Sequence, residues 1–167
     1  RAGIITDNGN FGATLAASFS QHLTRVGGSS VAEKVKYNET SPDTSILKIL
    51  QSKPEVIYLQ NDIPGLSVIL KRLTQLNYRG ARIVYYGGHD QSLIDTAGLA
   101  AEGLYVPWVI SKESNPLRDD FVTKFVNTYK HEPFVTAYFV YDGLILLDEA
   151  NKKCASDARC IEQYFYN

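Results

Sequence analysis

The sequence predicts an α/β fold with three layers, a Rossmann-like arrangement of a mostly parallel five-stranded sheet with helices on both faces. Short apolar runs of strand length alternate with segments whose apolar residues recur at helical spacing. Clusters of Gly, Pro, Asn and Asp separate these segments and supply turns. The 167 residues, 44% hydrophobic and 21% charged, suffice for one domain with its own core. Such alternation is typical of parallel sheets, whose right-handed crossovers place helices on both faces.

Five apolar runs are the predicted strands. The second run carries Glu33, Lys34 and Lys36, and these charges fit an edge strand better than a central one. The other four runs are mainly apolar, and turn residues follow the first and the fourth of them. The predicted strands span residues 2–6, 31–37, 56–59, 82–86 and 103–109.

Helical periodicity occupies the stretches between the predicted strands. Leu15, Phe19 and Leu23 recur every four residues, and the glycines at 27 and 28 end that helix. Pro follows Ser41 and Asn115, which is typical of the first turn of a helix. Further apolar stripes lie within residues 46–50, 66–73, 91–97 and 117–129.

The last long segment, residues 134–151, is apolar on nearly all sides. A helix of that composition is either buried all round or covered by something outside this chain. The sequence contains no Met and begins inside a predicted strand. We therefore expect it to be a piece of a longer protein.

Cys154 and Cys160 are the two cysteines, and they lie six positions apart. A continuous helix would separate their Cα atoms by about 9 Å, whereas a disulfide needs them within about 7 Å. A disulfide therefore requires a break at residues 155–159, a stretch with the composition of a turn. We predict that the bond forms, which favours an oxidising compartment; two unpaired thiols are the alternative.

Composition and missing motifs exclude several classes of function. The net charge of -1 gives no basic field for nucleic acid, and the longest apolar stretch is far shorter than the roughly 20 residues of a membrane span. The nucleophile elbow, the P-loop, the dinucleotide fingerprint and metal-ligand spacings are all absent. We expect a binding protein that is not an enzyme and that has no cofactor and no metal.

Ligands of parallel sheets bind beyond the carboxyl ends of the strands, so the loops there contain the candidate site. The first such loop contains Asn8 and Phe11, and an aromatic ring at the start of a helix either forms a pocket wall or covers the core. The third strand is followed by Asn61 and Asp62. The Asp62 carboxylate either neutralises a ligand ammonium or caps the next helix.

The loop after the fourth predicted strand begins Tyr-Tyr-Gly-Gly-His. Strand side chains alternate, so one tyrosine faces each side, and Tyr86, nearer the loop, is the better candidate for a pocket. Gly87 lets the backbone approach a ligand closely. No His, Cys or Asp lies at a spacing from His89 that suggests a metal site, so we expect His89 to cap a helix or to be solvated.

An alternative comes from Asp7, Asp62 and Lys112, which follow the first, third and fifth predicted strands. This arrangement is similar to the phosphoacceptor receiver domain. Receivers carry paired acids after the first strand and an aspartate directly at the end of the third, whereas this chain has one acid and then Gln-Asn. The likeness is therefore partial.

Four segments carry a broader resemblance. The opening strand and turn at 4–12, the strand at 54–59, the Ala-Gly…Ala-Glu-Gly segment at 97–104 and the Tyr-Asp-Gly helix at 137–143 are together similar to the type I periplasmic binding proteins. Within that family, the chain resembles the second lobe of the leucine/isoleucine/valine-binding group, which serves ABC importers. The resemblance implies that residues 1–167 form a single lobe. In it, residues 152–167 are a cysteine-containing turn and helix leading to a crossover that the chain lacks.

The resemblance also implies ligand contacts. By position they fall on Phe11, Asp62, Tyr86 and Thr136. Asp62 replaces a family tyrosine, and Tyr86 replaces the family acid that meets the ligand ammonium. These two departures put a branched-chain amino acid in doubt and leave another amino acid or a small polar metabolite as the expected ligand.

The implied function is ligand binding by hinge closure. The implied partners are the small-molecule ligand, the missing first lobe and an ABC permease, with a second copy of the chain as a further candidate. The implied location is periplasmic or extracellular. A sensory module of the same fold in a receptor or regulator is the alternative. The lobe would have the same structure in both classes of protein, so its sequence does not separate them.

Overall fold

The computed structural model describes residues 1–37, 39–111, 113 and 115–166, and it consists of two compact units. The first unit is Arg1–Trp108 and the second is Val109–Asn167. The predicted single lobe of residues 1–167 stays a prediction, so we describe each unit by itself.

A parallel sheet forms the centre of the first unit. Its strands follow the order β2-β1-β3-β4-β5, and every neighbouring pair is parallel. The sequence order reverses between β1 and β3, which is the place where sheets of this class bind ligands. The strands are β1 (Ala2–Thr6), β2 (Ser30–Lys34), β3 (Val56–Gln60), β4 (Ala81–Val84) and β5 (Leu104–Tyr105).

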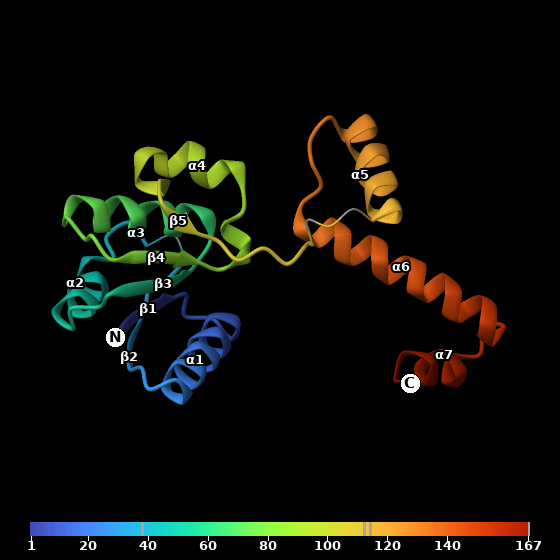
Figure 1. The fold of residues 1–167 in the computed structure, drawn as a ribbon, viewed down its shortest axis with the longest axis horizontal. Helices are drawn as coiled ribbons and strands as arrows, with labels where there is room; N and C mark the ends of the chain where they lie inside the picture. Colours follow the sequence, from blue (N-terminus) through green and yellow to red (C-terminus); the bar gives the residue numbers. More distant parts are fainter. Residues whose placement is uncertain (38, 112, 114, 167) are drawn as a thin grey trace. The chain divides into compact units, whose positions relative to one another are not determined.

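Helices cover both faces of this sheet, as predicted. Figure 1 shows α3 and α4 on one side and α1 on the other. On the α1 side, the ring of Phe19 stacks on Tyr58 of β3 with 4.9 Å between centroids. The helices of this unit are α1 (Asn10–Arg25), α2 (Asp43–Gln51), α3 (Ile63–Gln75) and α4 (Gln91–Ala97), with the short 3-10 helices η1 (Tyr86–Gly88) and η2 (Gly98–Ala101).

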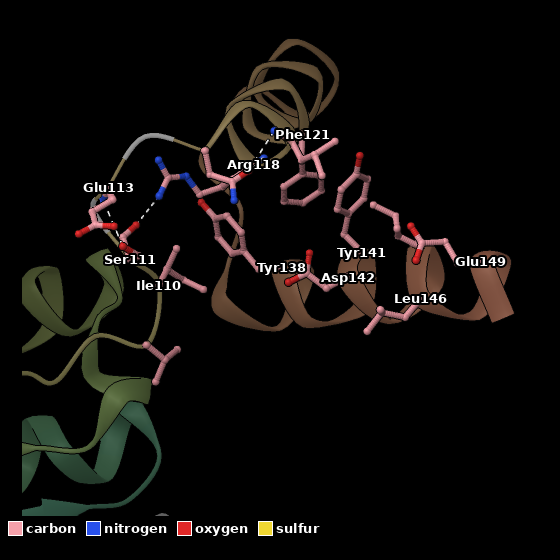
Figure 2. A pocket seen from close by; sticks show the side chains of 14 residues that line it. Ile110, Ser111, Glu113, Arg118, Phe121, Tyr138, Tyr141, Asp142, Leu146 and Glu149 are labelled. Carbon is pink, nitrogen blue, oxygen red and sulfur yellow. Dashed lines mark hydrogen bonds between the residues drawn. The ribbon is translucent and has the colours of Figure 1, made fainter. Parts of the chain in front are cut away.

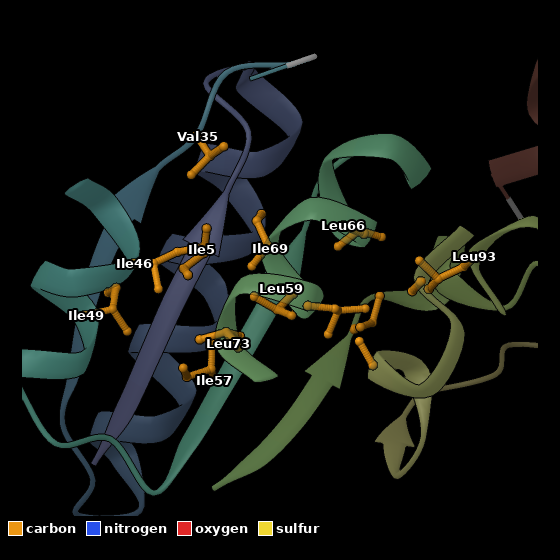
Figure 3. Packing of buried hydrophobic residues seen from close by; sticks show 14 residues of the cluster. Ile5, Val35, Ile46, Ile49, Ile57, Leu59, Leu66, Ile69, Leu73 and Leu93 are labelled. Atoms are coloured by element: carbon orange, nitrogen blue, oxygen red, sulfur yellow. The ribbon is translucent and has the colours of Figure 1, made fainter. Parts of the chain in front are cut away.

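The main core lies between the sheet and the helices α2, α3 and α4 (Figure 3). Ile57 and Leu59 of β3 are fully buried against it, while Tyr58 between them points to the α1 face because strand side chains alternate. Burial of each such aliphatic side chain contributes about 1.5–3 kcal/mol. The sheet is thus held from its faces, and residues just beyond its carboxyl edge, including Val35 and Tyr85, also pack against this core.

Three of the predicted strands end two or more residues later than the strands of the structure. The second strand ends at Lys34, and the fifth has only two residues. The fourth ends at Val84, because the next residues turn into η1, where the N–H of Gly88 donates to the carbonyl of Tyr85. The alternation argument that placed Tyr85 and Tyr86 on opposite sides of a strand is therefore wrong, since neither lies in one.

The second unit consists of α5 (Pro116–Tyr129), α6 (Val135–Cys154) and α7 (Ala158–Tyr166). Phe121 of α5 stacks on Tyr141 of α6 at 4.3 Å between centroids and meets Tyr138 edge-on at 5.3 Å. The predicted disulfide is confirmed: Cys154 and Cys160 are bonded, with Cα atoms 5.5 Å apart. Within the described residues, no helix combines the length and apolarity needed to cross a membrane.

The break that this disulfide needs lies just after α6. Ala155 and Ser156 have φ values of 47° and 66°, a left-handed conformation that ends a helix. The chain reverses there, and α7 begins at Ala158. A turn thus follows Cys154 and leads into α7, while the assignment of residues 152–167 as a segment leading to a crossover stays a prediction.

The predicted apolar helix at 134–151 corresponds to α6, and it is not buried all round. Phe139, Val140 and Leu144 are 52%, 62% and 61% exposed. Their side chains cost free energy in water at about 25 cal/mol per Å² of apolar surface. This face of α6 is therefore an uncovered apolar surface.

Candidate ligand-binding site

The candidate site lies at the carboxyl edge of the sheet, within the first unit. Because all five strands are parallel, the loops that follow β1, β3 and β4 emerge at the same edge. The predicted residues Asn8, Phe11, Asn61, Asp62 and Tyr86 belong to these loops or to the helix starts after them.

A buried carboxylate organises this edge. Asp7 is fully buried and accepts hydrogen bonds from Tyr37 Oη at 2.5 Å, Gln60 Nε2 at 2.6 Å and the N–H of Gly9 at 2.6 Å. Burial alone raises the pKa of Asp7, but hydrogen bonds from two side chains and two backbone N–H groups outweigh it, so this pKa lies below its ordinary value. Asp7 therefore joins the ends of β1, β2 and β3.

The loop held by Asp7 leads into α1 and presents Phe11. A Cβ at Gly12 would lie 2.5 Å from Gln60 Oε1 and 2.7 Å from Asp7 Oδ1, so only glycine allows this approach. Asn8 is exposed, and Phe11, in the first turn of α1, is 48% exposed. The position of Phe11 thus depends on a network that sequence analysis did not find, because Tyr37 and Gln60 lie far from Asp7 in the sequence.

Asn61 and Asp62 differ in their availability. Asn61 is fully buried; its Nδ2 donates to the carbonyl of Val35 at 3.2 Å and its Oδ1 accepts from the N–H of Asp62 at 2.9 Å. Its side chain therefore joins two loops and is not presented to a ligand. Asp62 is half-buried and caps α3, accepting from the N–H of Gly65 at 2.9 Å. The capping role foreseen for Asp62 is thus present.

Three aromatic rings form a surface at this edge, which we call the ring surface: Phe11, Tyr85 and Tyr86. Phe11 meets Tyr85 edge-on at 6.1 Å between centroids, and Tyr85 meets Tyr86 edge-on at 5.3 Å. A Cβ at Gly87 would lie 2.3 Å from the Tyr85 ring, so the glycine makes room for that ring. The sequence points to Tyr86 but not to Tyr85, which connects the other two rings.

Negative charge accompanies the ring surface. Burial raises the pKa of Tyr85, and the neighbouring Tyr86, Asp7 and Asp62 raise it further. Burial also raises the pKa of Tyr58, with smaller contributions from Tyr85 and Tyr86. The phenols of Tyr58 and Tyr85 therefore stay neutral at physiological pH.

A second aromatic contact lies at the same edge. His89, which follows η1, stacks on Trp108 with 3.8 Å between ring centroids and an interplanar angle of 26°. Trp108 is the only tryptophan of the sequence, and no sequence motif marks it as a site residue. In the described part of the chain, no three His, Cys, Asp or Glu side chains are grouped so that they could hold a metal ion.

The second unit contains a separate pocket of about 630 Å³ (Figure 2). The rings of Phe121, Tyr138 and Tyr141 form its apolar wall, and the carboxylates of Asp142 and Glu149 lie at its border. Arg118 lines it too, with its guanidinium paired to Asp119. Thr136, a predicted ligand contact, is exposed in the first turn of α6 and does not line this pocket.

Comparison with known proteins identifies the family. A sequence profile described as periplasmic binding protein matches residues 1–159. The chain belongs to this family. No curated protein matches the sequence. Lys112, part of the receiver alternative, lies outside the described residues.

Solved structures of periplasmic binding proteins share this fold. The leucine binding protein LivK from Thermotoga maritima has 23% identity and a TM-score of 0.89 over 98% of this chain and 48% of its own. LivJ from Streptococcus pneumoniae, solved with isoleucine, has 18% identity and a TM-score of 0.78 over 98% and 47%. A fatty acid ABC transporter substrate-binding protein from Thermomonospora curvata has 13% identity and a TM-score of 0.81 over 98% and 44%.

The chain therefore spans about half the length of these solved proteins. Identities in this range show the shared fold, and they do not transfer a ligand. The family is one of solute-binding proteins, described as periplasmic, and one structural neighbour is named an extracellular ligand-binding receptor.

Proposed function

We propose that this chain is the ligand-binding half of an ABC-transporter substrate-binding protein for an amino acid or a similar small polar metabolite. It binds its ligand by hinge closure and does not transform it. Membership of the periplasmic binding protein family is the observation that carries the proposal. The ring surface and Asp62, at the edge where parallel sheets bind ligands, support it.

In this mechanism the ligand first meets the half that this chain lacks, and the chain then closes over it. The ligand shifts the open–closed equilibrium by its differential affinity for the closed state. On this side the contacts are Phe11, Tyr86, the backbone at Gly87 and the carboxylate of Asp62, with Asn8 at the border. Asn61 contributes indirectly by holding the loop, and the contact predicted at Thr136, which belongs to the second unit, stays a prediction.

The proposed partners follow from the same mechanism. They are the small-molecule ligand, the other half of the binding protein and an ABC permease in the membrane. No nucleic acid takes part. The protein works in the periplasm or outside the cell, where the disulfide between Cys154 and Cys160 is stable.

The test is titration of the 167-residue chain with a mixture of L-amino acids. Two-dimensional ¹H–¹⁵N NMR should show weak, millimolar binding with shifts confined to the loops after β1, β3 and β4, because half of the contacts are missing. Calorimetry on the same sample should detect no tight complex. Tight stoichiometric binding would contradict a half-site, and the absence of shifts in these loops would contradict the site itself.

A further inference from the structure

The geometry of the carboxyl edge points to a ligand class, and we propose that the ligand carries both an aromatic ring and an ammonium group. Its ring packs on the ring surface of Phe11, Tyr85 and Tyr86, and its ammonium group lies beside Asp62. The inference rests on the proposed function and narrows it from small polar metabolites to aromatic amino acids or arylalkylamines.

Ring geometry is the first argument. The three rings contact each other at interplanar angles of 67° and 61°, in the edge-to-face arrangement that aromatic rings prefer. Phe11 is 48% exposed, and Tyr85 and Tyr86 are each half-buried, so all three keep accessible surface. A further planar ring can extend this arrangement, whereas an aliphatic side chain cannot make the same quadrupolar contacts.

Charge complementarity is the second argument. Asp62 uses its Oδ1 to cap α3, and the residue is partly exposed. Asp62 follows β3 and Tyr85 follows β4, and these two strands are neighbours in the sheet, so the carboxylate and the rings lie at the same edge. A cation beside aromatic faces and a carboxylate is attracted by both, while a ligand without a positive charge gains nothing from Asp62.

The division of roles between the two acids sharpens the assignment. Asp7 is fully buried and its oxygens are taken by Tyr37, Gln60 and Gly9. Asp62 is the acid that a ligand can reach at this edge among the residues we assign to the site. The ammonium group is therefore assigned to Asp62.

Four probes separate ring from charge in the experiment. L-phenylalanine carries the ring, the ammonium and a carboxylate; phenethylamine lacks the carboxylate; 3-phenylpropionate lacks the ammonium; and L-leucine lacks the ring. Each is titrated into the ¹⁵N-labelled 167-residue chain, and dissociation constants are read from the shifts of Phe11, Tyr85 and Tyr86. An aromatic pair is worth about a two- to tenfold gain in affinity, so L-phenylalanine should bind at least that much more tightly than L-leucine.

Substitutions then assign the two contacts. Phe11→Leu and Tyr86→Leu should remove the preference for L-phenylalanine over L-leucine, while Tyr166→Leu, which changes an 85% exposed ring on α7, serves as the matched control. Asp62→Asn should weaken L-phenylalanine and phenethylamine several-fold and leave 3-phenylpropionate unchanged. Asparagine is also a good N-cap, so α3 remains intact.

The outcomes distinguish this inference from the proposed function. Equal affinities for L-leucine and L-phenylalanine would overturn the aromatic assignment and leave amino-acid binding in place. An unchanged affinity of phenethylamine for the Asp62→Asn variant would overturn the ammonium assignment. If no probe shifts the three rings and no other amino acid does so, both proposals fail.

Discussion

Asp7 illustrates how one buried side chain can hold together the loops of a candidate site. Its carboxylate receives hydrogen bonds from residues that follow or end three different strands. The loop carrying Phe11 is therefore fixed by polar contacts inside the protein. Removing one of these contacts should change stability in a manner that depends on pH.

Tyr37→Phe tests this network. The hydrogen bond to Asp7 raises the pKa of Tyr37, with burial as a smaller cause, and the pKa of Asp7 is lowered. The stability from Asp7 is thus present above its unfolded pKa of about 3.9 and is lost as pH falls through its lower folded pKa. The stability from Tyr37 is present below about pH 10 and is lost as pH rises through its higher folded pKa.

The free energy of unfolding of Tyr37→Phe, measured by urea denaturation from pH 2 to 11, should be about 1 kcal/mol lower at pH 7. The value is modest because Tyr37 is 49% exposed and water can replace its hydroxyl. The decline of the free energy of unfolding at acid pH and its decline at alkaline pH should both be shallower than in the unchanged chain. Tyr105→Phe, at a 66% exposed tyrosine, is the control, and identical declines in both variants would refute the coupling.

Gly87→Ala tests the space beneath the ring surface. The new Cβ would overlap the Tyr85 ring, which lies 2.3 Å away, so the ring must move. We expect a loss of about 1–3 kcal/mol in the free energy of unfolding and a changed near-ultraviolet circular dichroism spectrum. Gly27→Ala would be strained by its φ of 81° without such an overlap. A Gly87→Ala spectrum identical to that of the unchanged chain would show that the ring does not depend on this glycine.

At the scale of elements, the disulfide joins the end of α6 to α7. A bond that closes so small a ring contributes about 2 kcal/mol on the chain-entropy model. In the Cys154→Ser/Cys160→Ser double variant, hydrogen exchange of residues 158–166 should therefore accelerate. Exchange in β1 and β3, which belong to the other unit, should stay unchanged and serves as the internal control. Equal protection of α7 in both proteins would mean that packing alone holds it.

Elements also show where sequence reasoning succeeds. The sheet, its parallel strands and the helices on both faces follow from apolar periodicity, because Ile57 and Leu59 are buried by the same pattern that predicts them. The ends of the strands cannot be predicted from this periodicity. The turn at Tyr86, for example, depends on backbone hydrogen bonds, which the residue types do not reveal. Tyr85, Tyr37 and Gln60 were missed for a related reason: their roles arise from contacts between loops distant in sequence.

At the scale of the whole molecule, the buried aliphatic cluster belongs entirely to the first unit. A chain of residues 1–108 should therefore fold on its own. We expect cooperative urea unfolding and retention of the ring-surface NMR shifts in that truncated protein. Non-cooperative unfolding would mean that the second unit is needed for the fold, and the full 167-residue chain measured in parallel provides the reference.

The uncovered face of α6 has a practical consequence for the chain in solution. Contiguous exposed aliphatic and aromatic groups, such as Phe139, Val140 and Leu144, attract one another and attract amphiphilic dyes. The chain should therefore enhance the fluorescence of anilinonaphthalene sulfonate while still folded, and its sedimentation coefficient should rise with concentration. Val140→Lys together with Leu144→Lys should abolish both effects, so that purification and storage of the chain become easier.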